Sequence, residues 1–224
     1  MVHPVSPPYP LVIFDVDGTL VDDTVFVWET LHRHFGSDPV AIRGAMDDYL
    51  AGRITYAQWF EHDIHFLKKG GATRASIDEA LTGMRLMDGA EETLTALTAA
   101  GVRVAVISGS LDLVLTRFFG ERWPFSDVFI NRIGFDAAGE IVSWEPTPFD
   151  MDHKASGLLE LSRRYDLPPE RIAFVGDNFN DVSIARLAGR SIAFNAKSRR
   201  LMAVASVTLL ERDLRLTLPF LLEE

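Results

Sequence analysis

FDVDGTL, residues 14–20, places Asp15 and Asp17 directly after a hydrophobic run and then breaks at Gly18. The run itself, LVIFDV, has the continuous β-branched and aromatic character of a strand buried on both faces, as strands of parallel sheets are. Alternate side chains of an extended segment share a face, so Asp15 and Asp17 are expected to point the same way. Gly18 then allows the chain to bend away. These residues predict a buried parallel strand that ends on a pair of carboxylates.

Three further runs of the same kind follow along the chain, and a helical pattern precedes each of them. They are VRVAVIS at 102–108, RIAFVGD at 171–177 and RSIAFN at 190–195. The helical segment before the first of these carries Glu91 in its first turn, where the helix dipole favours anions, and stops at Gly101. Alternating strands and helices are typical of an α/β fold with a doubly wound, Rossmann-like parallel sheet.

Residues 22–86 interrupt this alternation, because they are helix-like, rich in aromatics and contain no strand-like run. We therefore predict a helical subdomain at 22–86, inserted into an α/β core that consists of 1–21 and 87–224. Residues 128–144 indicate a hairpin appended to the edge of the sheet. Four aromatic side chains of the insertion are expected to form its own small core and not a cage around a ligand: Trp28, Trp59, Phe60 and Phe66.

The composition narrows the classes of partner. In 224 residues, 22 Lys and Arg against 32 Asp and Glu give a net charge of −10, which disfavours nucleic-acid and anionic-membrane partners. The absence of cysteine excludes disulfides, thiolate metal ligands and a cysteine nucleophile, and is compatible with a reducing cytoplasm. The start, MVHPVSPPYP, has no apolar h-region and is interpreted as an irregular lead-in, not a signal peptide. No run approaches the roughly 20 apolar residues of a membrane span. We expect a cytoplasmic protein that binds neither nucleic acid nor membrane.

Four polar clusters are expected at the carboxyl ends of the predicted parallel strands, the edge at which open α/β sheets bind their ligands. They are DVDGT at 15–19, Ser108 in ISGS, Lys154 in HKAS at a helix start, and GDNFND at 176–181. Each alone has an ordinary explanation, since Asp-Gly is common in turns and Ser108 could cap a helix. Four such clusters on one edge of one sheet favour a functional site.

Together these motifs resemble the haloacid dehalogenase superfamily, and within it the phosphoserine phosphatase-like branch. DVDGT, ISGS, HKAS and GDNFNDVSIA stand in the chain order of that branch, and the insertion lies where the branch carries its cap. The resemblance covers almost the whole chain past residue 10. It implies a phosphatase that uses Mg²⁺ and an aspartyl-phosphate intermediate to hydrolyse a small phosphorylated metabolite.

The resemblance also implies roles for the two aspartates of the first motif. Asp15 would be the nucleophile, and Asp17 would protonate the leaving alcohol and then deprotonate the attacking water. Two carboxylates close together raise the pKa of one, which favours a protonated acid at the start. Asp15, the main-chain carbonyl of Asp17 and Asp177 would bind the metal, with Asp181 acting through water or orienting the other ligands. Oxygen-only ligands suit Mg²⁺.

The remaining motif residues are implied to hold the transferring phosphoryl group. Ser108, Lys154 and Asn180 would contact its oxygens, and the backbone amide of Gly109, expected to open a helix, would add a donor. Ion-pumping relatives, which must preserve the aspartyl-phosphate, carry another residue at the position of Asp17. A carboxylate there favours turnover to free phosphate.

Two positions depart from the pattern of phosphoserine phosphatases. Those enzymes recognise the substrate's amine with a glutamate after the first motif and its carboxylate with an arginine in the cap, and the matching positions here are Thr24 and Asp63. Asp63 would repel the carboxylate of phosphoserine. We therefore hypothesise a different small phosphomonoester with a cationic or neutral leaving group, although Arg43 or Arg53 could supply the missing cation.

Two alternatives remain at this point. A phosphotransferase or phosphomutase would use the same aspartyl-phosphate and pass the phosphoryl group to a second substrate. A non-catalytic binding module with this fold is expected to lack one of Asp15, Asp17, Lys154 and Asp177, and all four are present. A dinucleotide-binding oxidoreductase is disfavoured because no G-x-G-x-x-G follows a strand. The sequence does not indicate the oligomeric state.

Overall fold

The computed structural model describes residues 7–223, so residues 1–6 of the predicted lead-in lie outside it. Its centre is a seven-stranded sheet with the order β6-β5-β4-β1-β7-β8-β9. The strands are β1 (Leu11–Phe14), β4 (Arg103–Leu111), β5 (Asp127–Phe135), β6 (Ile141–Glu145), β7 (Ile172–Gly176), β8 (Arg190–Phe194) and β9 (Val207–Leu209). β1 pairs in parallel with β4 on one side and β7 on the other, and β6 alone is antiparallel to its neighbour. The predicted doubly wound α/β fold is confirmed.

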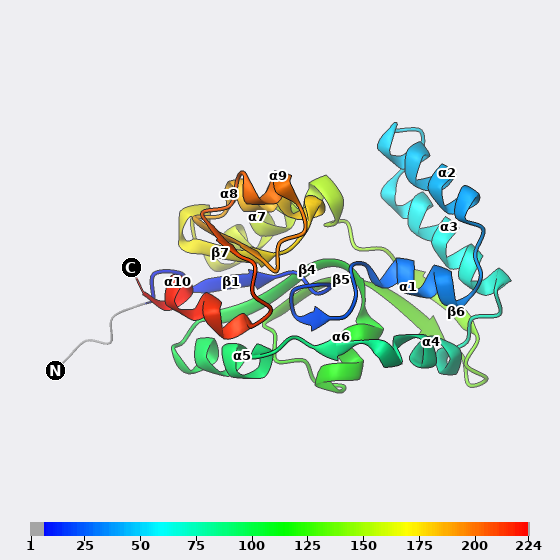
Figure 1. Ribbon diagram of the computed structural model, residues 1–224, viewed down its shortest axis with the longest axis horizontal. Coiled ribbons are helices and arrows are strands. Elements are labelled where there is room, and N and C mark those ends of the chain that lie inside the picture. Colours follow the sequence, from blue (N-terminus) through cyan, green and yellow to red (C-terminus); the bar gives the residue numbers. More distant parts are fainter. Residues whose placement is uncertain (1–6, 224) are drawn as a thin grey trace.

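Helices cover both faces of this sheet (Figure 1). α5 (Ala90–Ala99), α6 (Asp112–Phe119) and α10 (Leu218–Leu222) lie on one face, and α7 (Lys154–Tyr165), α8 (Val182–Leu187) and α9 (Arg199–Met202) lie on the other. The side chains of β1 alternate between the two resulting cores. Val12 and Phe14 pack in the core that includes α5, while Leu11 and Ile13 pack in the core that includes Leu158 of α7. Burial on both faces explains why the sequence of β1 has no polar alternation.

β4 is longer than the sequence predicted, and this corrects the position expected for Gly109. The strand continues to Leu111, and α6 begins only at Asp112. The register between β4 and β5 shifts after Ile107, and Leu111 still pairs with Asn131, so the chain stays extended through Gly109. Gly109 therefore does not open a helix.

The predicted hairpin is β5–β6 at the edge of the sheet, and it contacts the inserted helices. Gly139, in its turn, has a φ of 84°, a conformation that glycine adopts without strain. The carbonyl of Gly139 accepts a hydrogen bond of 2.8 Å from the amide of Arg74. Lys68 Nζ donates a bond of 2.9 Å to the carbonyl of Ile141. The hairpin thus supports the insertion from the core.

The insertion consists of α1 (Val27–His34), α2 (Pro39–Leu50), α3 (Tyr56–Lys69) and α4 (Arg74–Ala80), with α2 and α3 projecting away from the sheet (Figure 1). We call residues 22–86 the cap and the remainder the core. The expectation of no strand in this segment is wrong at its two ends, where β2 (Val21–Asp22) and β3 (Arg85–Leu86) pair antiparallel. Strands of two residues carry no periodicity that a sequence could display. Asp22 and Arg85 also form an ion pair of 2.6 Å across these connections.

The described helices include none that is long and apolar enough to cross a membrane.

Candidate active site

Asp15 follows β1 directly, and its amide donates a hydrogen bond of 3.0 Å to the carbonyl of Val175 in β7. The chain then turns at Gly18, which has a φ of 75°. A side chain at this position would overlap the carboxylate of Asp177. Gly18 is therefore required twice, by the backbone conformation and by the approach of the fourth motif to the first.

Lys154 is completely buried beneath the two carboxylates that it joins. Its Nζ lies 2.9 Å from Oδ1 of Asp15 and 2.7 Å from Oδ1 of Asp181. Burial disfavours the charged ammonium, but the neighbouring carboxylates outweigh burial and raise the pKa of Lys154 above its usual value. Lys154 is thus a permanent cation beside the expected nucleophile.

The fourth motif is organised around Asp181. Its Oδ2 accepts hydrogen bonds from the amides of Asp177 at 2.9 Å and Asn178 at 3.0 Å, while its Oδ1 accepts from Lys154. Burial raises the pKa of Asp181 to about 6, against the lowering effect of Lys154. Burial and the charge of Asp181 raise the pKa of Asp177 well above its usual value. Lys197 Nζ lies 2.6 Å from Oδ2 of Asp177.

Three carboxylates of this cluster could hold a metal ion. Asp15, Asp177 and Asp181 each offer an oxygen, and these oxygens lie within 4.8 Å of one another. Oδ1 of Asp177 is buried and has no hydrogen-bond partner, which suits a cation. Hard oxygen donors of this kind fit Mg²⁺. Both oxygens of Asp181 are already engaged, which supports an orienting role for that residue.

Asp17 is buried beside Asp15 and held at both oxygens. Oδ1 accepts a hydrogen bond of 2.8 Å from Oγ of Ser110, and Oδ2 accepts one of 2.7 Å from the amide of Val27 in the cap. The pKa of Asp17 is raised to about 7, chiefly by burial; the Val27 bond opposes this rise, and the charge of Asp15 adds to it. Burial therefore raises the pKa of Asp17 more than the charge of Asp15 does, although the sequence indicated the charge of Asp15 as the cause.

The residues implied to hold a phosphoryl group lie around the same carboxylates. Ser108, Gly109 and Asn180 line one cavity together with Asp15 and Asp17. Oγ of Ser108 accepts a hydrogen bond of 3.1 Å from the amide of Ser110. Oδ1 of Asn180 is buried without a hydrogen-bond partner. The four motifs thus converge as the sequence predicted.

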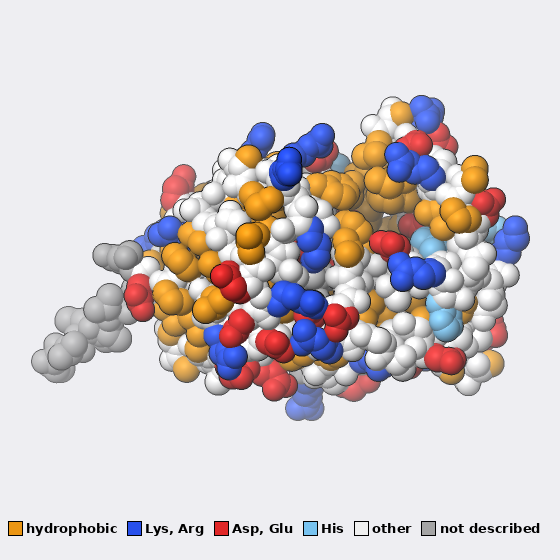
Figure 2. All heavy atoms as spheres, in the orientation of Figure 1, with side chains coloured by type: hydrophobic (Ala, Val, Ile, Leu, Met, Phe, Trp, Pro, Cys, Tyr) orange, Lys and Arg blue, Asp and Glu red, His pale blue; other side chains and the backbone are white. Residues whose placement is uncertain are grey.

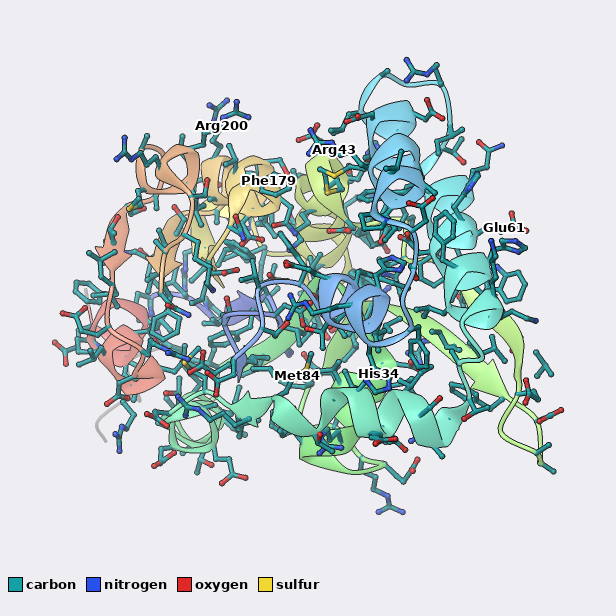
Figure 3. The ribbon with its side chains drawn as sticks, turned by 45° about the vertical axis from the view of Figure 1, so that its right-hand side comes forward. His34, Arg43, Glu61, Met84, Phe179 and Arg200 are labelled. Carbon is teal, nitrogen blue, oxygen red and sulfur yellow. The ribbon has the colours of Figure 1, made fainter. Side chains whose placement is uncertain are left out.

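This cavity has a volume of about 400 Å³ and lies between core and cap. Figure 2 shows hydrophobic side chains gathered around the opening between the α2–α3 arm and the core. In Figure 3, Phe179 on the core and Arg43 on α2 lie on the two sides of this opening. Trp28 and Trp59 line the cavity. Trp28 also packs edge-on against the buried Phe60, as expected for a core of the insertion. The indole Nε1 of Trp28 donates a hydrogen bond of 3.0 Å to the carbonyl of Gly109.

The two residues considered for specificity are separated in the structure. Asp63 is buried, lines the cavity and lies 3.0 Å from Nε2 of His32. Burial raises the pKa of Asp63, and the hydrogen bond with His32 opposes the rise. Thr24 is also buried, but it lines a separate depression beside Lys197, and its hydroxyl has no hydrogen-bond partner.

The two arginines that might have supplied a cation to the site are engaged elsewhere. Arg43 pairs with Asp47 at 3.1 Å and Arg53 with Asp48 at 2.6 Å, both at the surface. Neither arginine is among the residues that line the cavity.

Sequence reasoning missed several polar residues of the site, among them Ser110, Lys197, Asn131 and Asp150. Ser110 stands two positions after Ser108 in ISGS, and Lys197 follows a buried strand in FNAK, so both carried a local signal. Asn131 and Asp150 carried none, because they come from the hairpin and from the loop before α7. Asn131 is fully buried and donates through Nδ2 to the carbonyl of Gly109 at 2.8 Å and to Oη of Tyr56 at 2.9 Å.

An α/β core with carboxylates at the carboxyl ends of β1 and β7, covered by a helical cap, defines a class of hydrolases. Residues 9–189 match the haloacid dehalogenase-like hydrolase family, and the chain belongs to it.

Several relatives are phosphoserine phosphatases. The chain is 26% identical over 217 residues to that of Methanocaldococcus jannaschii, covering 94% of this chain and 97% of that protein. It is 28% identical over 188 residues to that of Archaeoglobus fulgidus, covering 84% of this chain and 53% of that protein. The chain therefore spans about half of the Archaeoglobus protein. A solved structure described as a phospho-aspartyl intermediate analogue of phosphoserine phosphatase superposes with a TM-score of 0.74 at 26% identity, covering 95% of this chain and 99% of that one.

Proposed function

We propose that this protein is a metal-dependent phosphatase that hydrolyses a small phosphomonoester through an aspartyl-phosphate formed on Asp15. The observation that carries the proposal is the pair of buried aspartates with different partners. Asp15 lies 2.9 Å from the permanent cation Lys154, whereas Asp17 has a pKa of about 7. A nucleophile paired with a cation therefore lies beside an acid that can exchange its proton near neutral pH.

The chain's own residues support each step. A carboxylate oxygen of Asp15 attacks phosphorus while Asp17 gives its proton to the leaving alcohol as the bond from phosphorus to that oxygen breaks. Asp17 then takes a proton from the water that attacks phosphorus, and the bond from phosphorus to the Asp15 oxygen breaks to release inorganic phosphate and restore the carboxylate. Ser110 and the amide of Val27 keep Asp17 oriented through both steps. Ser108, the amide of Gly109, Asn180 and Lys154 would bind the phosphoryl oxygens.

A divalent cation, which we propose is Mg²⁺, would be held by Asp15, the main-chain carbonyl of Asp17 and Asp177, with Asp181 orienting them. It would supply positive charge against the anionic phosphoryl group. The buried, unpartnered Oδ1 of Asp177 supports this assignment.

The competing functions are less well supported. A phosphotransferase or phosphomutase needs a second acceptor, whereas Asp17 is suited to activating water. A non-catalytic module has no use for a buried carboxylate held at a pKa of about 7 beside a buried lysine. The phosphoserine phosphatases among the relatives also favour hydrolysis.

The substrate remains a proposal of its own. Phosphoserine, which the names of relatives suggest, would place its carboxylate in a cavity where Asp63 stands and where Arg43 and Arg53 do not reach. We therefore keep the hypothesis that the substrate is another small phosphorylated metabolite. We also propose that residues 22–86 form the cap subdomain and that residues 1–21 and 87–224 form the core domain. A cytoplasmic location, and the lack of nucleic-acid and membrane partners, stay predictions.

Phosphate release tests the proposal directly. Purified protein is incubated with a panel of small phosphomonoesters, with and without Mg²⁺, beside Asp15→Asn and the control Asp152→Asn, which changes an exposed carboxylate. We expect release that requires Mg²⁺, is lost in Asp15→Asn and persists in Asp152→Asn without any acceptor. Release that is unchanged in Asp15→Asn would overturn the assignment of the nucleophile. Release that needs a second alcohol would instead indicate a phosphotransferase.

A further inference from the structure

Asp150 is a buried carboxylate in the cavity that the proposed reaction does not use. It lies on the loop between β6 and α7, lines the cavity and is 8% exposed. Within residues 7–223, no lysine, arginine or histidine forms an ion pair with it. Nδ2 of Asn180 donates a hydrogen bond to it at 3.4 Å, and the hydroxyl of Tyr56 is a second polar neighbour. The charge of Lys154 acts on Asp150 from beyond ion-pair distance. A cationic ligand in the cavity would be the direct partner that this carboxylate lacks.

The loop holds Asp150 at a defined place between the phosphate-binding residues and the cap. Met151, the next residue, has a φ of 52°, which is unusual for a residue other than glycine or asparagine. A side chain at Gly109 would overlap the carboxylate of Asp150, so the carboxylate packs directly against the backbone of Gly109. On its other side stands Tyr56, whose pKa is raised first by burial and then by the charge of Asp150. The carboxylate thus lies beside Gly109 and Asn180, which are proposed to bind the phosphoryl group, and close to Tyr56 of the cap.

The rest of the cavity favours a cation over an anion. Of the described residues that line it, Arg33 is the one lysine or arginine, and Arg33 is paired with Glu29 at 3.0 Å. Aromatic side chains from two cap helices line the same space, among them Trp28 of α1 and Trp59 of α3. Aromatic faces attract ammonium groups, most strongly when these are removed from water. A second carboxylate on a substrate would find no free cation here.

We propose that Asp150 and the cap aromatics bind an ammonium group on the leaving alcohol. The substrate class is then a phosphomonoester of an amino alcohol that carries no carboxylate. This inference rests on the proposed phosphatase function and specifies its substrate. It also gives a role to Trp28 and Trp59, which the chemistry at Asp15 does not require.

Two matched pairs of substrates isolate the charge. O-phosphoethanolamine is compared with n-propyl phosphate, and phosphocholine is compared with 3,3-dimethylbutyl phosphate. In each pair the second compound has nearly the same shape as the first but carries no charge on the alcohol. We expect kcat/KM to be at least about tenfold higher for the cationic member of a pair, and for O-phosphoethanolamine to exceed phosphoserine by a similar factor. In Asp150→Asn the ratio of cationic to neutral substrate should fall toward one. Asp152→Asn, an exposed neighbour, should keep the ratio of the unchanged protein.

The outcomes separate this inference from the function on which it rests. Three results would overturn the inference and leave the proposed phosphatase function intact. They are equal kcat/KM for both members of each pair, phosphoserine as the best substrate, and an unchanged ratio in Asp150→Asn. Trp59→Leu, which should lower the ratio for the choline pair, replaces Asp150→Asn if that variant fails to fold. If no substrate is turned over, the proposed function fails, and calorimetric binding of phosphocholine and 3,3-dimethylbutyl phosphate decides the inference: equal affinities would overturn it.

Discussion

The amide of Val27, the first residue of the cap helix α1, donates a hydrogen bond of 2.7 Å to Oδ2 of Asp17 in the core. Asp17, the proposed acid and base, is therefore held in part by the first helix of the cap. This bond also lowers the pKa of Asp17 against the effect of burial. The position of the cap and the protonation of Asp17 are linked through one backbone group.

Val27→Pro tests this link without disturbing the helix. Proline is well tolerated at the first position of a helix, and Phe26 already has the extended conformation that a residue before proline adopts, with φ −144° and ψ 131°. The substitution removes the amide proton, so the pKa of Asp17 should rise and the alkaline limb of kcat/KM should move to higher pH. We expect turnover to fall about tenfold. Val27→Ala, which keeps the amide but loses the side chain, is the control, and the same pH profile in both variants would contradict the link.

Asp17 should also make stability depend on pH. Its pKa is about 7 in the folded protein and near 3.8 in the unfolded chain, so between these values the folded state holds a proton that the unfolded state has lost. The free energy of unfolding should therefore fall as pH rises from 5 to 7, by about 1 to 2 kcal/mol per pH unit for this group.

Urea unfolding of the unchanged protein and of Asp17→Asn at pH 5, 6, 7 and 8 measures this effect. The variant lacks the titrating group, so the stability difference between the two proteins should change up to pH 7 and then level off. A difference that is constant across this range would show that burial of Asp17 does not govern its protonation.

Removing Lys154 should destabilise the fold as well as abolish turnover. Lys154→Met leaves the carboxylates of Asp15 and Asp181 buried without their cation, which typically costs about 3 to 5 kcal/mol. The double variant Lys154→Met/Asp181→Asn should recover part of that loss in urea unfolding. Lys197→Met, at a lysine that is partly exposed, should cost less. Equal losses for the two lysines would argue against the burial of Lys154 as the cause.

Gly18→Ala and Gly36→Ala separate backbone strain from steric overlap. Both glycines have positive φ, 75° and 62°, but only Gly18 has neighbours that a side chain would meet. We expect Gly36→Ala to cost about 1 to 2 kcal/mol from strain alone. Gly18→Ala should cost clearly more and should also reduce phosphate release, because its methyl group displaces Asp177. Similar melting temperatures for the two variants would mean that Asp177 moves aside without a loss of stability.

Asn131 should act as a positioning residue between the cap and the phosphate-binding backbone. Asn131→Leu leaves the carbonyl of Gly109 and the amide of Thr147 without this partner, which should cost about 1 to 3 kcal/mol. Tyr56→Phe removes only the bond to the cap and should have a smaller effect on stability. Both variants should raise KM, and urea unfolding with steady-state kinetics distinguishes them. If Tyr56→Phe destabilises as much as Asn131→Leu, the cap contact and not Gly109 carries the effect.

The sheet could be predicted because each of its central strands is specified by its own residues. Leu11–Phe14 and Ile172–Gly176 are continuous apolar runs, and parallel strands buried on both faces require such runs. The convergence of the motifs followed from the same rule, since the carboxyl ends of parallel strands meet at one edge. The family resemblance supplied the roles of Asp15 and Asp17.

Other features depend on residues that are distant in sequence. β4 continues past Ser108 because Leu111 pairs with Asn131, and this extension brings Ser110 to Asp17. Pairing between strands that are far apart in the chain leaves no local period to detect. The same holds for Asp150, which reaches the site through a loop of no regular pattern.

By itself, the sequence determined the doubly wound sheet, the inserted helices and the set of carboxylates at the edge of the sheet, because hydrophobic periodicity and the alternation of strands and helices along the chain are local properties. The tertiary structure alone decided that Asp63 pairs with His32, that Thr24 lies outside the cavity and that Asp17 has a pKa of about 7. Partners and desolvation come from packing between core and cap, and a side chain's charge state follows from them and not from its position in the chain.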